Sequence, residues 1–194
     1  MIPLPSLTEE LSTIQTALDA ADHPQRLNWM RGLGKREQKA LYALADAPPS
    51  RLTLEVEFFH GAPGEVVIHH GQNSLPLFSS FQKRVCLHGG EAPVPQGYNH
   101  QTMAWLTGPG HFIVRYDGDD VVFDYTVLPE DRPEAFPPLR DNLAGVSRFV
   151  YGNMIDRMRR VSDHCTIGIA LREERPTGDL FMLLREDPTP VQEA

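Results

Sequence analysis

The stretch HFIVRYDGDDVVFDYTV, residues 111–127, contains two runs rich in β-branched and aromatic residues, His111–Tyr116 and Val121–Val127. Runs of this composition favour β-strands. The segment between them, Asp117–Asp120, reads DGDD, and aspartate and glycine adopt the backbone angles that tight turns require. The stretch therefore predicts an antiparallel hairpin, and it makes sequential antiparallel pairing the simplest topology for the chain.

Further strand candidates lie on both sides of this hairpin. From Leu52 to Phe58, apolar and polar residues alternate with a period of two, as in a half-buried strand. Together with the hairpin the candidates number eight, and Pro176–Asp179 has the composition of a turn between the last two. The other candidates are Glu65–His69, Phe78–Leu87, Asn99–Thr107, Cys165–Arg172 and Leu180–Arg185.

Eight antiparallel strands with short connections can close into a barrel whose interior is filled by side chains or holds one small ligand. We therefore predict an α+β, mainly β fold, which is a lipocalin-like barrel or a strongly curved sheet. N-terminal helices precede the strands, and one helix is inserted before the last two. The alternative is an open α+β roll, in which the helices pack across a curved sheet of fewer strands.

Helical patterns dominate the N-terminal segment. Ser6–Glu9 has the form of a capping box, and apolar residues follow it at helical spacing as far as Leu18. Pro24 suits the first turn of a second helix, and Lys35–Ala45 resumes the pattern as a third. The sequence therefore predicts three short helices before the first strand.

A second helix-forming region interrupts the strands. Pro129–Pro138 holds four prolines and cannot join a sheet interior, so it is expected to run over the surface. After it, apolar residues recur at helical spacing from Val146 to Val161, which predicts a helix near residues 146–163. The chain is expected to be one domain, with a helical segment at 1–47, a β-rich body at 52–185 and a frayed tail at 187–194.

Composition narrows the classes of partner and the compartment. The net charge of −8 opposes attraction to nucleic acid or to anionic lipid, and no uncharged stretch is long and apolar enough to span a bilayer. Met1–Glu10 lacks the basic start of a signal peptide, and two cysteines alone are expected to be buried thiols. Fifteen arginines against three lysines indicate the codon bias of a GC-rich bacterial genome. We expect a cytoplasmic bacterial protein with no nucleic-acid or membrane partner.

The candidate site residues are polar side chains beside apolar strands. His69 and His70 are adjacent, so on a strand at most one of them faces inward, and the His-x-His spacing of barrel metal sites is absent. No Walker A, Rossmann or Gly-x-Ser-x-Gly motif occurs either. We therefore expect no metal and no cofactor.

Two further candidates could act as acids or bases. His100 opens a strand candidate and, as an imidazole, titrates near neutrality. Asp124 lies in the cavity if the Val122 face of its strand is interior, and on the outer surface if the Phe123 face is interior. His100 and Asp124 are the catalytic candidates, and the ligand-binding candidates are His70, Asn73, His100, Asp124 and Tyr125.

Several segments, among them Tyr98–Trp105, Thr107–Gly110, Phe149–Gly152 and Val161–Gly168, resemble an uncharacterised family of bacterial proteins of no established activity. The resemblance covers roughly residues 60–185 and implies no catalytic residues.

Three functions fit these observations. The leading hypothesis is binding of a small, mostly apolar molecule inside the barrel, with a few polar anchors. The second is a cofactor-independent enzyme, such as an isomerase, cyclase or hydratase, that uses the same cavity. The third is a partner-binding or structural protein with a filled core, for which the interior has no room beyond a water or two.

Overall fold

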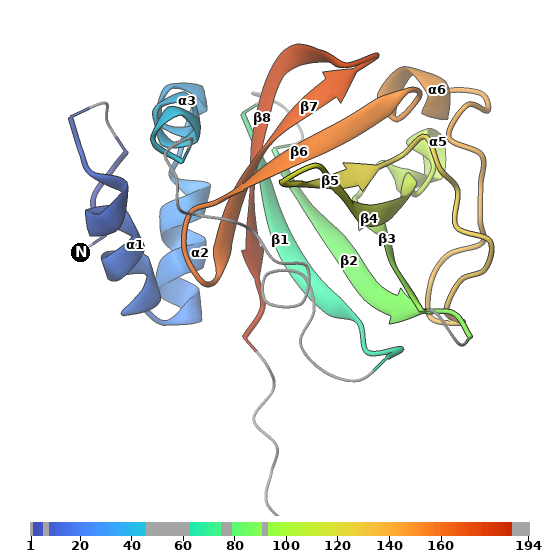
Figure 1. The fold of residues 1–194 in the computed structure, drawn as a ribbon, viewed down its shortest axis with the longest axis horizontal. Helices are drawn as coiled ribbons and strands as arrows, with labels where there is room; N and C mark the ends of the chain where they lie inside the picture. The colour runs from blue at the N-terminus through green and yellow to red at the C-terminus, as the bar shows by residue number, and fades with distance from the viewer. Residues whose placement is uncertain (1, 6–7, 46–62, 75–78, 91–92, 188–194) are drawn as a thin grey trace, which may run out of the picture.

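The computed structural model describes residues 2–5, 8–45, 63–74, 79–90 and 93–187. Eight antiparallel strands close into a barrel in which each strand pairs with its neighbour in sequence and β1 pairs with β8. The N-terminal helices stand beside the barrel and contact β1, β7 and β8 (Figure 1). The predicted fold class, a mainly β barrel with N-terminal helices, is confirmed.

Three described helices precede the strands, and two short helices lie between strands, one before β4 and one before β6. The helices are α1 (Leu11–Asp19), α2 (His23–Arg31), α3 (Lys35–Leu44), α5 (Ala104–Thr107) and α6 (Ser147–Val150). The strands are β1 (Val67–Asn73), β2 (Ser80–His88), β3 (Val94–His100), β4 (His111–Asp117), β5 (Asp120–Asp124), β6 (Met154–Arg160), β7 (Cys165–Arg172) and β8 (Arg175–Arg185).

The hairpin predicted at residues 111–127 is confirmed. Asp117 of β4 pairs with Asp120 of β5, and Gly118 has a φ of 63° in the turn between them. This left-handed angle favours glycine, which has no Cβ to clash. The sequence DGDD therefore closes the hairpin as its composition indicates.

The helix predicted near residues 146–163 is present only over Ser147–Val150, and the prediction is wrong for the rest. Asn153 has a φ of 53°, which turns the chain out of α6 and into β6. In β6, Asp156 and Met158 are buried and point inward, while Arg157 between them pairs with surface aspartates. The apolar residues of this segment fit the helical period of about 3.6 residues and also the strand period of two. Pairing with β5 and β7 selects the strand.

Other boundaries also differ from the predictions. The predicted strand Asn99–Thr107 divides into the end of β3 and helix α5. The last turn lies at Glu173 and Glu174, with φ of 52° and 66°, so Pro176–Asp179 belongs to β8. A register shift between β7 and β8 accommodates this longer strand.

The predicted capping box and one predicted strand fall wholly or partly on residues that the structure does not describe. The candidate Leu52–Phe58 lies outside the described residues, and β6 completes the barrel instead. Ser6 also lies outside them, and α1 begins at Leu11 with Glu10 before it. Pro24 is in the first turn of α2, as predicted.

Two hydrophobic cores lie on opposite faces of the sheet. The inner core fills much of the barrel with residues such as Phe112, Phe123 and Leu183. The outer core lies between the N-terminal helices and the outside of β7 and β8, and it includes Leu41 of α3 and Ile167 of β7. The helices therefore cover a part of the sheet that would otherwise expose apolar side chains.

Glycines on inward positions make room for aromatic rings. A Cβ on Gly71 or Gly168 would lie 2.4 Å from the ring of Phe81 or Phe181, respectively. Without those Cβ atoms the rings of Phe81 and Phe181 lie close against the strand backbone, and both rings line the cavity described next.

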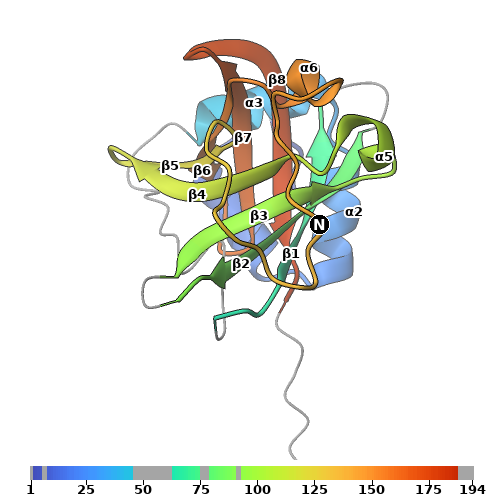
Figure 2. The ribbon, with the colours of Figure 1, turned by 90° about the vertical axis from the view of Figure 1, so that its right-hand side faces the viewer.

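The segment Pro129–Pro138 runs along the outside of the barrel, on the side opposite the N-terminal helices, as Figure 2 shows. Its Phe136 packs on Cys86 and Tyr98, so the predicted surface loop covers an outer patch of β2 and β3. Cys86 and Cys165 are free and buried, as predicted. In the part of the chain that the structure describes, no helix is long and apolar enough to cross a membrane.

Candidate functional site

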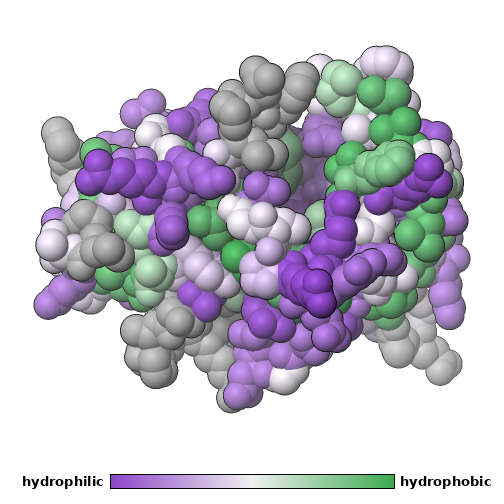
Figure 3. All heavy atoms as spheres, turned by 90° about the horizontal axis from the view of Figure 1, so that it is seen from above, coloured by the Kyte–Doolittle hydropathy of each residue, from purple (hydrophilic) through white to green (hydrophobic). Residues whose placement is uncertain are grey.

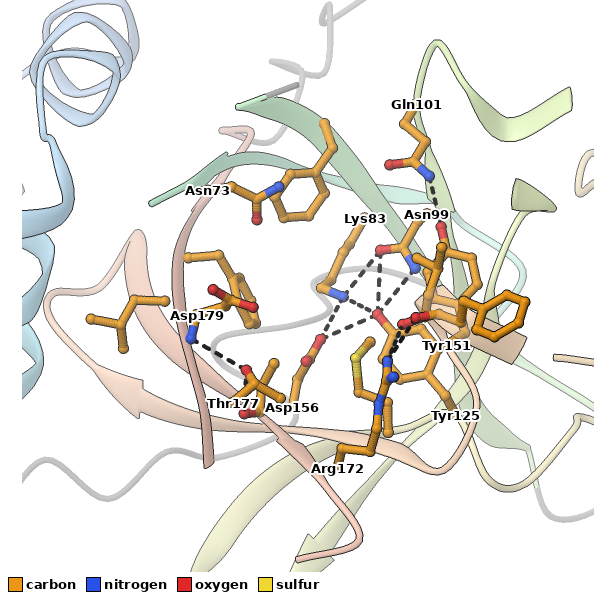
Figure 4. Close-up of a pocket in the computed structure, with 17 residues that line it drawn as sticks. Asn73, Lys83, Asn99, Gln101, Tyr125, Tyr151, Asp156, Arg172, Thr177 and Asp179 are labelled. Atoms are coloured by element: carbon orange, nitrogen blue, oxygen red, sulfur yellow. Dashed lines mark hydrogen bonds and ion pairs between the residues drawn. The ribbon is translucent and has the colours of Figure 1, made fainter. Parts of the chain in front are cut away.

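A cavity of about 330 Å³ opens at the end of the barrel beside α6 and the β7–β8 hairpin. Seen from above, this face of the molecule is hollowed beside a group of hydrophobic residues (Figure 3). Lining residues come from β1, β2, β3, β6, β7, β8 and α6. The polar ones are Asn73, Lys83, Asn99, Gln101, Tyr125, Tyr151, Asp156, Arg172, Thr177 and Asp179 (Figure 4).

Lys83 is the most unusual of these residues, because it is a charged side chain inside a barrel. It shares the inward face of β2 with Phe81 and Val85, and only 2% of its surface is exposed. Its Nζ lies 4.8 Å from the ring centre of Phe123 and 4.9 Å from that of Phe112. Aromatic faces at this distance stabilise a cation.

Three polar side chains surround the Lys83 amine. Nζ donates hydrogen bonds to Asp156 Oδ2 at 3.0 Å, to Asn99 Oδ1 at 3.1 Å, and to the hydroxyl oxygen of Tyr125. Asn99 Nδ2 donates to the same hydroxyl oxygen at 3.0 Å. The four side chains, which come from β2, β3, the end of β5 and β6, point toward one another in Figure 4. We call them the lysine cluster.

Burial sets the electrostatics of the lysine cluster. Desolvation lowers the pKa of Lys83, and the carboxylate of Asp156 opposes this by favouring the ammonium. Desolvation and the Asp156 charge both raise the pKa of Tyr125 well above its usual value, so Tyr125 remains a neutral hydroxyl. The cluster therefore offers an amine, a carboxylate and a hydroxyl beside an apolar cavity.

A second tyrosine connects the lysine cluster to the cavity wall. The ring of Tyr151 stacks on that of Tyr125, with centroids 5.4 Å apart and planes 15° from parallel. Its hydroxyl accepts a hydrogen bond of 2.8 Å from Gln101 Nε2, and burial raises its pKa to about 12. Arg172 Nη2 donates to the carbonyl of Phe149 at 2.9 Å, which fixes α6 at the rim.

Apolar side chains gather near the cavity mouth. Phe149 of α6 lines the cavity and is 65% exposed. On α5, which packs near α6, Trp105 is 74% exposed and Leu106 is also exposed. The surface around α5 and α6 therefore exposes apolar side chains beside the cavity.

Two of the five predicted ligand-binding residues line this cavity. Asn73, at the end of β1, and Tyr125, after β5, are both lining residues. Asp124 is not, because the Phe123 face of β5 is interior and Asp124 lies on the outer face. It is buried there, and it accepts a hydrogen bond of 2.8 Å from Arg115 Nε.

The two predicted histidines also lie away from the cavity. His70 points outward from β1, where its Nε2 lies 2.8 Å from Glu186 Oε1 and its ring contacts His23. His100 is the last residue of β3, and together with Pro138 it lines a different groove. Burial and nearby Arg84 lower the pKa of His100. The structure thus does not bring the five candidates together.

Sequence reasoning missed Lys83, Asn99 and Asp156. Lys83 carried a signal, because Phe81, Lys83 and Val85 alternate with polar neighbours and so place the lysine on the apolar face. Asp156 was hidden by the predicted helix at residues 146–163, since only a strand puts it on the same face as Met154 and Met158.

Fold and site together define the class: a closed antiparallel barrel with a cavity whose inner end carries a buried ionic and hydrogen-bonded cluster. Comparison with family models, with curated proteins and with solved structures finds no match for this chain. The resemblance to an uncharacterised bacterial family gains no support from these comparisons. Within the described ranges, no three His, Cys, Asp or Glu side chains group as metal ligands would.

Proposed function

We propose that this protein binds a small molecule with an apolar body and one polar end, in the manner of a lipocalin-like barrel. The observation that carries the proposal is the lysine cluster at the inner end of the cavity. A buried ion pair contributes little net stability, because the loss of hydration offsets much of its attraction. Its place at the wall of a cavity therefore favours a role in recognition.

The cavity has the size and the lining of a ligand site. Its volume of about 330 Å³ falls within the range of about 300–1,000 Å³ typical of pockets for small molecules. Phe81, Met154, Leu180 and Phe181 supply apolar walls, and the lysine cluster supplies a few fixed polar groups. This volume counts against the hypothesis of a filled structural core, which leaves room for a water or two only.

The second candidate is a cofactor-independent enzyme in the same cavity. The observation that favours it is the contact between the Tyr125 hydroxyl and both Lys83 and Asp156, which gives a proton donor beside a carboxylate. The groups that would move a proton are then those of the lysine cluster, and His100 and Asp124 have no part in it. Cytoplasmic location belongs to the proposal too, supported by the free Cys86 and Cys165. Bacterial origin is also proposed, supported by the fifteen arginines against three lysines.

Two measurements test binding. Native mass spectrometry of freshly purified protein should show a co-purified small molecule. Anilinonaphthalene sulfonate should bind with enhanced fluorescence, and Ala170→Trp should weaken this by about tenfold or more, because Ala170 lines the cavity and an indole there fills space.

The matched control is Arg175→Trp, on the same hairpin but exposed and outside the cavity lining. It should bind the dye as the original protein does. If Ala170→Trp folds and also binds unchanged, the dye does not enter the barrel, and the proposal loses its support.

A further inference from the structure

We propose that Lys83 captures a carbonyl compound in this cavity as an imine, which makes the ligand class an aldehyde or unhindered ketone with an apolar body. This inference rests on the proposed function and deepens it. It starts from the placement of a primary amine in the cavity wall, beside a carboxylate and a hydroxyl.

The position of Lys83 distinguishes it from the other lysines. Lys35 and Lys39 are on α3, outside the barrel, and both are exposed. A carbonyl compound that enters the cavity is held at high effective concentration beside the Lys83 amine, whereas the exposed amines meet it only at its bulk concentration. Burial also lowers the pKa of Lys83, which raises the share of nucleophilic amine.

The reaction needs no oxidant or reductant. The Lys83 ammonium first passes a proton to Asp156, and the amine nitrogen attacks the carbonyl carbon to form a carbinolamine. The carbon–oxygen bond then breaks, the oxygen leaves as water with the two remaining amine protons, and a carbon–nitrogen double bond forms. Return of the proton from Asp156 gives the protonated imine, so ammonium plus carbonyl becomes iminium plus water.

The surroundings of Nζ suit the product as well as the reactant. An iminium keeps the positive charge of the ammonium, so Asp156, 3.0 Å from Nζ, remains its counter-ion. The rings of Phe112 and Phe123 remain within cation–π distance of the same nitrogen. The charge that the barrel already accommodates is therefore conserved through the reaction.

The hydrogen bonds also adapt without leaving a buried acceptor unsatisfied. A protonated imine has one N–H, which Asp156 accepts. Asn99 Oδ1 then loses the lysine donor, but the Tyr125 hydroxyl lies 3.3 Å from that oxygen and can donate to it. The same hydroxyl lies 3.2 Å from Asp156 Oδ2, so the proton of Tyr125 has two acceptors to choose between.

The experiment uses trans-cinnamaldehyde as the probe and cinnamyl alcohol as a matched compound that cannot form an imine. The full-length protein is incubated with the aldehyde near neutral pH, reduced with cyanoborohydride, digested and mapped by peptide mass spectrometry. We expect a reduced adduct on Lys83 at about tenfold or greater excess over Lys35 and Lys39, because the bound aldehyde is held beside the amine. Cinnamyl alcohol in excess should suppress it.

Each outcome bears on one proposal. Equal labelling of all three lysines, or binding of both compounds by calorimetry with no adduct on Lys83, overturns the imine while binding in the cavity stands. If neither compound binds and Ala170→Trp also leaves dye binding unchanged, the proposed function fails as well. Lys83→Met should abolish the dominant adduct, and the internal comparison with Lys35 and Lys39 remains decisive if that variant does not fold.

Discussion

Lys83 and Asp156 form an ion pair with side chains only 2% and 4% exposed, and this decides what substitutions there do. Taking two charges out of water is unfavourable, and their attraction and hydrogen bonds offset that penalty only while both are present. Removing either residue therefore leaves the other as a buried charge without a counter-ion, and this penalty decides the loss of stability.

We predict that Asp156→Asn destabilises the fold by about 3–5 kcal/mol, because it leaves the Lys83 ammonium buried without a counter-ion. Adding Lys83→Met should recover at least half of the loss. Urea unfolding of the single and double variants measures both. The control is Asp120→Asn, whose pair with Arg157 is 45% and 39% exposed and should matter by about 0–1 kcal/mol. An Asp156→Asn protein as stable as that control contradicts the prediction.

Gly97 gives a second prediction at this scale. A Cβ there would lie 2.4 Å from the backbone carbonyl oxygen of Arg84 and 2.7 Å from the ring of Phe112. Since a backbone atom cannot move aside easily, Gly97→Ala should lower the free energy of unfolding by about 1–3 kcal/mol. Gly90→Ala, where a Cβ meets nothing within 4 Å, is the control and should leave the urea midpoint nearly unchanged.

Individual residues show how far the sequence alone could reach toward the site. Tyr125 was predictable because it follows Val121 and Phe123 at a period of two, and that apolar face is the interior. His70 and Asp124 were polar residues beside apolar runs, but both face outward. Sequence neighbours do not reveal which face closes the barrel, so Asn99 and Asp156 emerge only once β3 and β6 are paired.

At the scale of elements, predictability followed the strength of the local pattern. The β4–β5 hairpin has a turn sequence and two β-rich runs, so local and tertiary preferences agree. The segment from α6 to β6 has apolar residues that fit both periods, and the barrel overrides the local helical preference because it needs a strand between β5 and β7. The turn at Glu173–Glu174 has no glycine, so composition placed it too late in the chain.

The contact between β4 and the segment Pro129–Pro138 predicts that the stability of the fold is sensitive to acid. His111 Nε2, at the start of β4, donates to the carbonyl of Pro138 at 3.2 Å. Burial lowers the pKa of His111 below its ordinary value, opposed by the Pro138 carbonyl and assisted by the Arg132 charge. Below about pH 6.5 the unfolded chain therefore binds a proton before the folded one does, and stability falls as pH falls through this window.

We expect His111→Gln to reduce this loss, since glutamine can still donate to Pro138 but does not titrate. Thermal unfolding at about pH 7.5 and about pH 5.5 should show a smaller drop in the variant than in the original protein. Comparison at about pH 7.5 and about pH 8.5 is the control, because neither state protonates there and the difference between the proteins should stay constant. Equal acid sensitivity of both proteins refutes the assignment.

At the scale of the whole molecule, β7 and β8 belong to both hydrophobic cores. Phe181 of β8 faces the barrel interior, while Met182, the next residue, faces the N-terminal helices. In β7, Ile167 packs on the helical side and Gly168 makes room for the Phe181 ring on the other. Loss of either core therefore removes support from strands that the other core requires, and barrel and helices should unfold as one cooperative unit.

We predict that Leu41→Ala, in α3 and far from the cavity, destabilises both parts together by about 2–5 kcal/mol, because Leu41 is fully buried in the outer core. In a Trp105→Phe background, Trp29 fluorescence reports on the helices, and pulse labelling of the buried Cys86 thiol on β2 reports on the barrel. Both signals should shift to the same lower urea midpoint. The exposed Leu4 supplies the control, since Leu4→Ala should move neither midpoint appreciably. Separate midpoints for the two signals would show that the helices unfold from a barrel that stands without them.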